Sequence, residues 1–217
     1  MNKLLYKELR LAASPLSYFF IAFALMTFLP GYPILLGAFF TTLGIFQSFR
    51  SMRENNDIAY SLLLPVAKAD IVRSKFAFAV FIELCSFAVM LIATLIRMAL
   101  LPDAPVYTQN ALMGANFSFL GFALLVFGLF NLCFLRGFFK TAYHFTKPFV
   151  VYCIVSFLTV AAAETLWHLP GFAAVNTLGF AHMGLQLGIF FAGALLSALL
   201  TLLALRASVK SFECIDL

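Results

Sequence analysis

Positive charge occurs along this chain in four short clusters, separated by long stretches that are apolar and almost uncharged. Thirteen of the fourteen Lys and Arg residues belong to these clusters, and Arg97 is the exception. The clusters are Lys3, Lys7 and Arg10; Arg50, Arg53, Lys68, Arg73 and Lys75; Arg136, Lys140 and Lys147; and Arg206 and Lys210. Because basic residues beside membrane spans stay on the cytoplasmic side, an even number of crossings must separate each cluster from the next. Two crossings per interval predict six transmembrane helices with both termini in the cytoplasm.

Composition supports the same fold class, an all-α integral membrane protein. The 217 residues are 64% hydrophobic and 11% charged, whereas soluble domains are about 25% charged. A net charge of +5 would suggest a nucleic-acid partner in a soluble protein, but here the basic residues lie at predicted membrane borders. We therefore expect membrane lipids and no nucleic acid among the partners. The expected location is a cell membrane, namely the plasma membrane of a bacterium.

The four cysteines predict neither a disulfide nor a metal site. Cys85, Cys133 and Cys153 lie in apolar runs, where cysteine acts as a small hydrophobic residue, and Cys214 is near the C-terminus. No two of them have the spacing of a metal-binding or redox pair. We expect no metal and no cofactor bound to this chain.

The apolar runs set the approximate span boundaries within a single domain, residues 1–217. The predicted spans are residues 14–29, 33–49, 76–100, 112–135, 148–163 and 183–205. The first, second and fifth are short against the ~20 residues that cross a bilayer core. Pro15 suits the first turn of a helix.

Small residues recur at helix-packing intervals on the fourth and sixth spans. The two series are Gly114, Gly121 and Gly128, and Gly184, Gly188 and Ala192. Each series predicts a stripe where another helix backbone approaches closely, in this chain or in a second copy of it.

Two segments outside the spans are predicted to lie at the membrane surface. In residues 1–13, basic residues at positions 3, 7 and 10 oppose apolar residues at positions 5, 9 and 12, which predicts an interfacial amphipathic helix on the cytoplasmic leaflet. The alternative is that this helix only extends the first span. Residues 164–181 predict an extracellular re-entrant or interfacial hairpin, anchored by Trp167.

The cytoplasmic segment 50–75 is predicted to contain a short helix. Ser51 and Glu54 have the S-x-x-E spacing of a capping box, which predicts that a helix starts here. Pro65 ends it, because proline supplies no N–H donor and disfavours helical geometry in the preceding residue.

The predicted helix, residues 52–63, has two faces. Glu54, Asp57 and Ser61 form an acidic side, and Ile58 and Leu62 form an apolar one. On physical grounds the helix could dock a partner protein or lie against the chain's own helices.

Taken together, the N-terminal helix, the spans and the segment between spans two and three resemble those of a known protein family. An N-terminal amphipathic helix with K-E-L-R, six spans, and the phrase R-E-N-N-D-I-A-Y-S-L-L-L-P-V-A-K-A-D-I-V-R-S-K-F between spans two and three are similar to the membrane subunit of ABC-2 type transporters. The resemblance covers nearly the whole chain, and its specific part is residues 50–76. Small permeases of this kind also resemble the membrane subunits of staphylococcal exporters of phenol-soluble modulins, which are amphipathic peptides.

The resemblance implies roles for particular segments. Residues 50–75 would hold the coupling helix, which contacts the ATP-binding subunit and transmits its closure to the spans. Carried over by position, the ATPase contacts would be Arg53, Glu54, Asp57, Ile58, Tyr60 and Leu62. Residues 1–13 would be the connecting helix, and residues 164–181 the re-entrant segment.

The chain has no G-x-x-x-x-G-K-[ST] phosphate loop, so we expect it not to be an enzyme and expect ATP hydrolysis on a partner subunit. The resemblance implies an ATP-binding cassette ATPase and a second permease, identical or related. The expected function is outward transport of an amphipathic or hydrophobic peptide, drug or lipid by alternating access. Two other classes remain open: a secondary transporter driven by an ion gradient, and a membrane immunity or assembly factor that moves nothing.

Two charged residues inside the third span are candidates for a translocation path. Glu83 lies about two turns into the span, where one charge costs roughly 2.5 to 3.5 kcal/mol, so it should face protein or water. A buried structural hydrogen bond or a protonated side chain is the alternative. Arg97 is about 40° off the same helix face, and snorkelling to the outer headgroups is its alternative.

Overall fold

The computed structural model describes residues 2–141 and 144–215, and within these residues every regular element is helical. The elements in chain order are α1 (Asn2–Lys7), η1 (Glu8–Ala12), α2 (Pro15–Phe19), η2 (Phe20–Phe28), α3 (Leu36–Glu54), α4 (Asp57–Leu62), α5 (Lys68–Leu100), α6 (Pro105–Thr108), α7 (Phe117–Phe130), η3 (Asn131–Leu135), α8 (Arg136–Thr141), α9 (Thr146–Leu166), η4 (Ala173–Asn176) and α10 (Met183–Glu213). Of the η elements, η1 and η3 are π-helical, and η2 and η4 are 3₁₀-helical.

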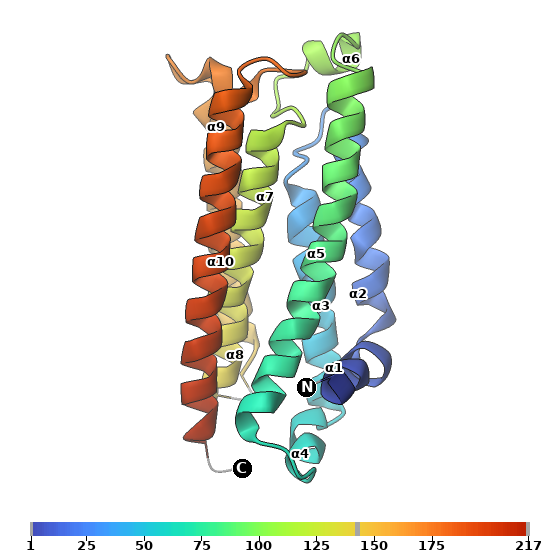
Figure 1. Ribbon diagram of the computed structural model, residues 1–217, viewed down its shortest axis with the longest axis vertical. Helices are drawn as coiled ribbons and strands as arrows, with labels where there is room; N and C mark the ends of the chain where they lie inside the picture. Colours follow the sequence, from blue (N-terminus) through green and yellow to red (C-terminus); the bar gives the residue numbers. More distant parts are fainter. Residues whose placement is uncertain (1, 142–143, 216–217) are drawn as a thin grey trace.

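The long helices form an elongated bundle (Figure 1). α2, α3, α5, α7, α9 and α10 run along its long axis. α1, α4 and the last turns of α10 lie toward one end of the bundle, which we call the charged end, whereas α6 lies at the opposite end.

Four helical segments are long and apolar enough to cross a membrane. They are Lys68–Leu100, Phe117–Thr141, Thr146–Leu166 and Met183–Glu213, and a fifth span is counted if Lys3–Ala12 and Pro15–Phe28 form one broken span. The predicted six spans are therefore not confirmed by this measure. The physical reason is composition and length: α3 ends among Arg50, Arg53 and Glu54, and α2 with η2 is shorter than the ~20 residues of a bilayer core.

The N-terminal helix does not continue the first lengthwise helix. The segments Lys3–Ala12 and Pro15–Phe28 are bent by 92° relative to one another. Ser14 has extended backbone and its hydroxyl accepts a hydrogen bond from Leu16 N, so it caps α2, with Pro15 in the first turn as the sequence predicts. The two segments therefore do not form one straight helix.

The segment after α3 differs from the sequence prediction. Ser51 is not a cap, because α3 continues through it to Glu54. The break comes at the next two residues: Asn56 has the left-handed conformation (φ 53°), which asparagine tolerates better than most residues, and α4 begins directly after it. The predicted helix 52–63 is therefore wrong in its start, and α4 is a shorter, separate helix.

Glycines on α7 bring this helix against α10. A Cβ built on Gly121 would lie 2.8 Å from the Ile189 backbone oxygen, and one on Gly128 would lie 2.7 Å from the Ser197 Cα. Gly193 of α10 faces the Gly121 backbone directly. The predicted stripe on α7 is thus a contact within the chain. The predicted stripe on α10 is not, because a Cβ on Gly184 or Gly188 would meet nothing within 4 Å.

Aromatic side chains pack α9 and η3 against α3 in the half of the bundle nearer the charged end. The rings of Phe46 and Phe149 are stacked at 3.8 Å, and Phe49 meets Phe134 edge to face at 5.6 Å. The hydroxyls of Thr42 and Tyr152 lie 2.6 Å apart, which ties α3 to α9 by a polar contact inside this apolar region. A fully buried hydroxyl pair of this kind fixes the register of the two helices.

The predicted re-entrant segment 164–181 begins with the last residues of α9, and after them η4 is its one regular element. It is held by hydrogen bonds to neighbouring segments: Glu164 Oε2 accepts from Met113 N at 2.7 Å, and Asn176 Oδ1 accepts from Gly114 N at 2.7 Å. These contacts pin the α9–α10 connection to the chain that leads into α7.

Candidate functional site

The most buried charge at the charged end is Lys75, in the third turn of α5. Its side chain is fully buried, whereas Arg73, two residues earlier, is exposed. The helix geometry explains the difference, since residues two apart point to different sides and Lys75 follows the buried Ile71 and Val72 onto the inner face. Lys75 Nζ donates to Glu8 Oε2 at 2.9 Å and to Asp57 Oδ2 at 2.6 Å.

The N-terminal segment supplies both an acid and a base to this cluster. Glu8, the first residue of the π-helical η1, is 1% exposed and turned inward. Lys7 Nζ lies 2.6 Å from Asp57 Oδ1, and it also donates to Ser61 Oγ at 2.6 Å. The basic stripe predicted for residues 1–13 is therefore divided, because Lys7 turns toward the protein while Lys3 and Arg10 are exposed.

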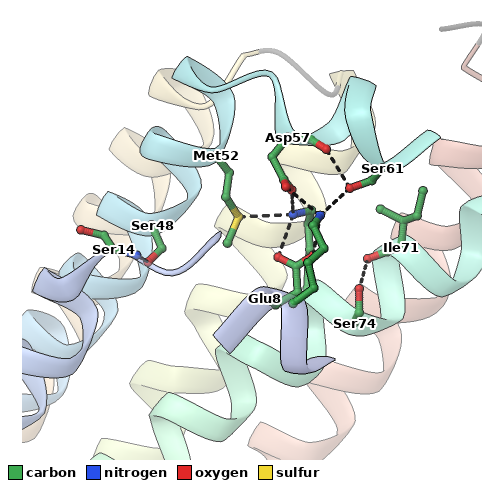
Figure 2. A network of polar contacts seen from close by, with 10 residues as sticks. Glu8, Ser14, Ser48, Met52, Asp57, Ser61, Ile71 and Ser74 are labelled. Atoms are coloured by element: carbon green, nitrogen blue, oxygen red, sulfur yellow. Dashed lines mark hydrogen bonds and ion pairs between the residues drawn. The ribbon is translucent and has the colours of Figure 1, made fainter. Parts of the chain in front are cut away.

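α4 supplies the other two hydrogen-bond acceptors of these lysines, Asp57 and Ser61. The left-handed Asn56 reverses the chain so that Asp57, the first residue of α4, reaches the two lysines. Ser61 lies one turn later, where its hydroxyl donates to the Asp57 carbonyl at 2.7 Å and accepts from Lys7. Figure 2 shows Glu8, Met52, Asp57 and Ser61 converging on one point from different elements. We call Lys7, Glu8, Asp57 and Lys75 the ionic cluster.

The ionic cluster is charge-balanced. Two ammonium groups face two carboxylates, with one oxygen of each carboxylate bonded to Lys75. Such balance is needed at this depth, because an unpaired buried charge costs several kcal/mol whereas a fully paired one is tolerated. Burial by itself raises the pKa of the Asp57 carboxyl, but the charges and hydrogen bonds of Lys75 and Lys7 outweigh burial and hold the pKa below its ordinary value.

The ionic cluster links three helical segments and lies close to a fourth. It joins η1, α4 and α5 through short charge-assisted hydrogen bonds, and Met52 Sδ of α3 lies 3.3 Å from Lys75 Nζ. A displacement of α4 would thus act on α5 and on the N-terminal segment together. Among the described residues, no group of three or more His, Cys, Asp or Glu could hold a metal ion.

A second polar contact ties the N-terminal segment to α3. The Ser14 backbone N–H donates to Ser48 Oγ at 2.7 Å, and Ser17 Oγ donates to the Gly44 carbonyl at 2.6 Å. The two serine hydroxyls, Ser17 and Ser48, are 2.6 Å apart. Ser14 and Ser48 appear beside the ionic cluster in Figure 2, so the bend between η1 and α2 is fixed on both sides.

The residues that the family resemblance implied as ATPase contacts divide into two groups in the structure. Asp57 belongs to the ionic cluster, and Ile58 and Leu62 pack against the chain's own core. Arg53, Glu54 and Tyr60 are exposed, and the exposed apolar surface continues beyond α4 at Leu63 and Leu64. Tyr60 is 67% exposed and Leu63 is 81% exposed. We call Arg53, Glu54, Tyr60, Leu63 and Leu64 the α4 outer surface.

Glu83 and Arg97, the candidate path residues, lie in different surroundings. Glu83 Oε2 accepts from Asn131 Nδ2 at 3.1 Å, and Glu83 faces a pocket between α5, α7 and α10. Arg97 is buried at the opposite end of α5, where it donates to the Thr27 carbonyl and its guanidinium lies 3.8 Å over the Tyr107 ring. The structure does not bring the two residues together, and Arg97 points into the protein instead of outward to headgroups.

Sequence reasoning missed Glu8 and Lys75 as a buried ion pair beside Asp57. Both residues were visible, Lys75 as a member of a basic cluster and Glu8 within K-E-L-R. One signal was available for Glu8: by helical arithmetic it lies roughly within a quarter-turn of the apolar stripe of residues 5, 9 and 12, not among the basic residues. An acidic residue at that border indicates an internal partner.

Comparison with protein families gives one match: the model described as ABC-2 family transporter protein covers residues 3–213. The match includes the ionic cluster, the α4 outer surface and all the long helices. Comparisons with curated proteins and with solved structures each gave no match.

Proposed function

The chain belongs to the ABC-2 transporter family, and from this premise we propose that it is the permease subunit of an ATP-driven exporter. Membership makes it a multi-pass membrane component of an ABC transporter. The observation that carries the finer proposal is that α4 and its flanks have two sides: the exposed α4 outer surface, and an inner side bonded to the ionic cluster.

The proposed topology has six spans, with the charged end in the cytoplasm. Its support is the position of the basic clusters, all of which border the charged end once α2 with η2 and α3 are counted as the first two spans. α3 ends in charged residues because its last turns leave the membrane and carry the chain to α4. In this arrangement residues 1–13 lie at the cytoplasmic interface and residues 164–181 lie outside.

The α4 outer surface is the proposed docking site for an ATP-binding cassette ATPase. It combines an apolar centre, Tyr60, Leu63 and Leu64, with the flanking charges of Arg53 and Glu54. An apolar centre with a charged rim is the usual anatomy of a specific protein interface. These apolar residues lie beyond the proposed membrane boundary, where lipid would not cover them and another protein would.

The ionic cluster is the proposed transmission element. When the ATPase subunits close on ATP, they would push α4, and the bonds of Asp57 to Lys7 and Lys75 would move the N-terminal segment and α5 with it. Because α5 is continuous from Lys68 to Leu100, a tilt at its charged end would reach the opposite end of the bundle. Two permeases, identical or related, would alternate between inward-open and outward-open states and move an amphipathic or hydrophobic cargo outward.

The test of this proposal is assembly with the cognate ATPase. Tyr60→Asp together with Leu63→Asp places two charges in the apolar centre, and the pair should abolish copurification of the ATPase while leaving the permease folded. Val106→Asp is the matched control, since Val106 is 57% exposed on α6 at the opposite end and its substitution should leave assembly intact. Full assembly and transport in the double variant would show that α4 is not the docking site.

A further inference from the structure

A lateral pocket between α5, α7 and α10 is a second feature of the bundle that the ionic cluster does not explain. Its volume is about 400 Å³, which falls within the range of small-molecule sites. Val80, Leu124, Phe127 and Ala194 give it apolar walls. Leu84 and Leu202 are 57% and 54% exposed at its rim, so the pocket opens on the side surface of the bundle.

One acidic side chain lines this mostly apolar pocket, whose other polar lining residues are Ser197 and Thr201. Glu83 is 5% exposed and makes no ion pair with any residue that the structure describes. Its Oε2 is bonded to Asn131, but its Oε1 has no hydrogen-bond partner within the described chain. A carboxyl group in hydrocarbon is costly and nearly always has a partner, so an unpartnered oxygen here indicates a ligand.

Asn131, which lies beside Glu83, also has a polar atom without a hydrogen-bond partner among the described residues. Asn131 donates to Glu83 Oε2 and to Thr201 Oγ1, at 3.1 and 3.0 Å, while its own acceptor, Oδ1, has no partner among the described residues. When the Glu83 carboxyl is ionised, both atoms without partners, Glu83 Oε1 and Asn131 Oδ1, are acceptors. Asn131 also begins the π-helical segment η3, and π-helical insertions in α-helices occur frequently at functional sites.

We infer that this pocket binds single-chain amphipaths that carry a primary ammonium group. The ammonium has N–H donors and a positive charge, which match the free Oε1 and the negative charge of the Glu83 carboxylate, and the aliphatic chain would occupy the apolar walls. As a statement about cargo, the inference deepens the proposed transport function and rests on it. Binding itself requires neither the ATPase nor ATP.

The depth of the pocket suits entry from the cytoplasmic leaflet. Glu83 is eight residues beyond Lys75 on α5, a rise of ~12 Å along the helix axis, so it lies in the half of the bundle nearer the charged end. The wall residue Ala194 is nearer the opposite end than Thr201, since α10 starts there at Met183. An amine bound at Glu83 would thus have the orientation of an inner-leaflet amphipath, with its head toward the cytoplasm and its chain toward the bilayer centre.

The experiment uses the full chain in phosphatidylcholine nanodiscs, without ATPase, and a dodecylamine derivative that carries a photoreactive diazirine on its alkyl chain. Cross-links mapped by mass spectrometry should fall on the pocket walls, around Leu84, Phe127 and Leu202. Unlabelled dodecylamine should compete for this site, whereas dodecanol and dodecyl sulfate, which have the same chain, should compete at least about tenfold more weakly. Equal competition by all three would overturn the inference, because it would show that the pocket takes any alkyl chain.

Substitutions of Glu83 test whether its carboxylate binds the ammonium group. Glu83→Gln should weaken competition by dodecylamine about tenfold or more, Glu83→Asp should retain most of it, and Glu213→Gln, an exposed carboxylate at the end of α10, should change nothing. Unchanged competition in Glu83→Gln would overturn the inference. If that variant does not fold, Ala198→Phe decides, because it fills the pocket from the exposed rim and leaves the carboxyl in place: lost labelling supports the site and unchanged labelling contradicts it. Since no ATPase is present, these outcomes are independent of whether α4 docks one.

Discussion

Lys75 Nζ and Asp57 Oδ2 lie 2.6 Å apart, and this contact joins the long helix α5 to the short helix α4. The lysine is fully buried and the aspartate is largely so. The same aspartate holds Lys7 through its other oxygen, and the same lysine holds Glu8. Three segments that are far apart in the sequence are therefore connected through one pair of charges.

Replacement of Lys75 by methionine should strongly destabilise the protein. The substitution leaves the buried Glu8 without its charged partner at 2.9 Å and removes one of the two partners of Asp57, and breaking a buried pair typically costs about 3–5 kcal/mol. Thermal unfolding of the purified protein in detergent measures the effect. Arg73→Met is the matched control: its ion pair with Asp70 is about half exposed, so the expected loss is at most about 1 kcal/mol. Equal losses in the two variants would contradict the burial and pairing of Lys75.

Stability should fall at acidic pH in a way that depends on Asp57. Although burial opposes it, the pKa of Asp57 is held below the ordinary value of 3.8 by Lys75 and Lys7. A carboxyl group with a depressed folded-state pKa contributes stability that is fully present above its unfolded pKa and is lost as the pH falls through the folded pKa. The midpoint of thermal unfolding should therefore fall below about pH 4, and part of this fall should depend on Asp57.

Asp57→Asn is the variant that tests this assignment. It should be less stable than the unsubstituted chain at neutral pH, and the difference between the two should shrink as the pH is lowered through the acidic range. A constant difference at all pH values would show that the two lysines do not stabilise the ionised form of Asp57 in the folded protein.

The sequence predicted the elements that depend on local pattern and missed those that depend on distant pairing. Apolar runs located the long helices, and Pro15 was correctly placed in a first helical turn. Asp57 was identified as a residue of interest, but its partners were not, because Lys7 and Lys75 are brought to it only when the bundle forms.

The errors have separate physical causes. The Ser51–Glu54 spacing suggested a helix start, yet a helix that is already running overrides a potential cap, and the break fell where Asn56 takes the left-handed conformation. The glycine interval on α10 pointed to the wrong positions, since Gly193 makes the contact with α7 while Gly184 and Gly188 face open space. A repeat interval shows that a close approach is allowed, but not which face the bundle uses.

Substitution of Glu8 should separate assembly from transport. Glu8→Gln removes one charge from the ionic cluster but does not touch the α4 outer surface, so the ATPase should still copurify while ATP-driven transport decreases. Lys3→Met, an exposed change on the preceding helix α1, should affect neither measurement. Transport at the unsubstituted level in a folded Glu8→Gln variant would show that the cluster does not transmit the movement of α4.

The contact between α7 and α10 predicts opposite results for two glycines. Gly121→Ala should destabilise the bundle by about 1–3 kcal/mol, because its Cβ would lie 2.8 Å from a backbone oxygen of α10 that cannot move freely. Gly188→Ala meets nothing within 4 Å and should be neutral or slightly stabilising. Thermal unfolding of both variants in detergent tests the pair, and equal effects would argue against the close approach.

The proposed docking of the ATPase requires that α4 faces the cytoplasm. Tyr60→Cys, in a background with Cys85, Cys133, Cys153 and Cys214 replaced by serine, places one reactive thiol on the α4 outer surface. A membrane-impermeant maleimide should label this thiol in inside-out vesicles, should fail to label it in intact cells, and should be blocked when the cognate ATPase is coexpressed. Labelling from outside intact cells would contradict the cytoplasmic position of α4 and, with it, the proposed function.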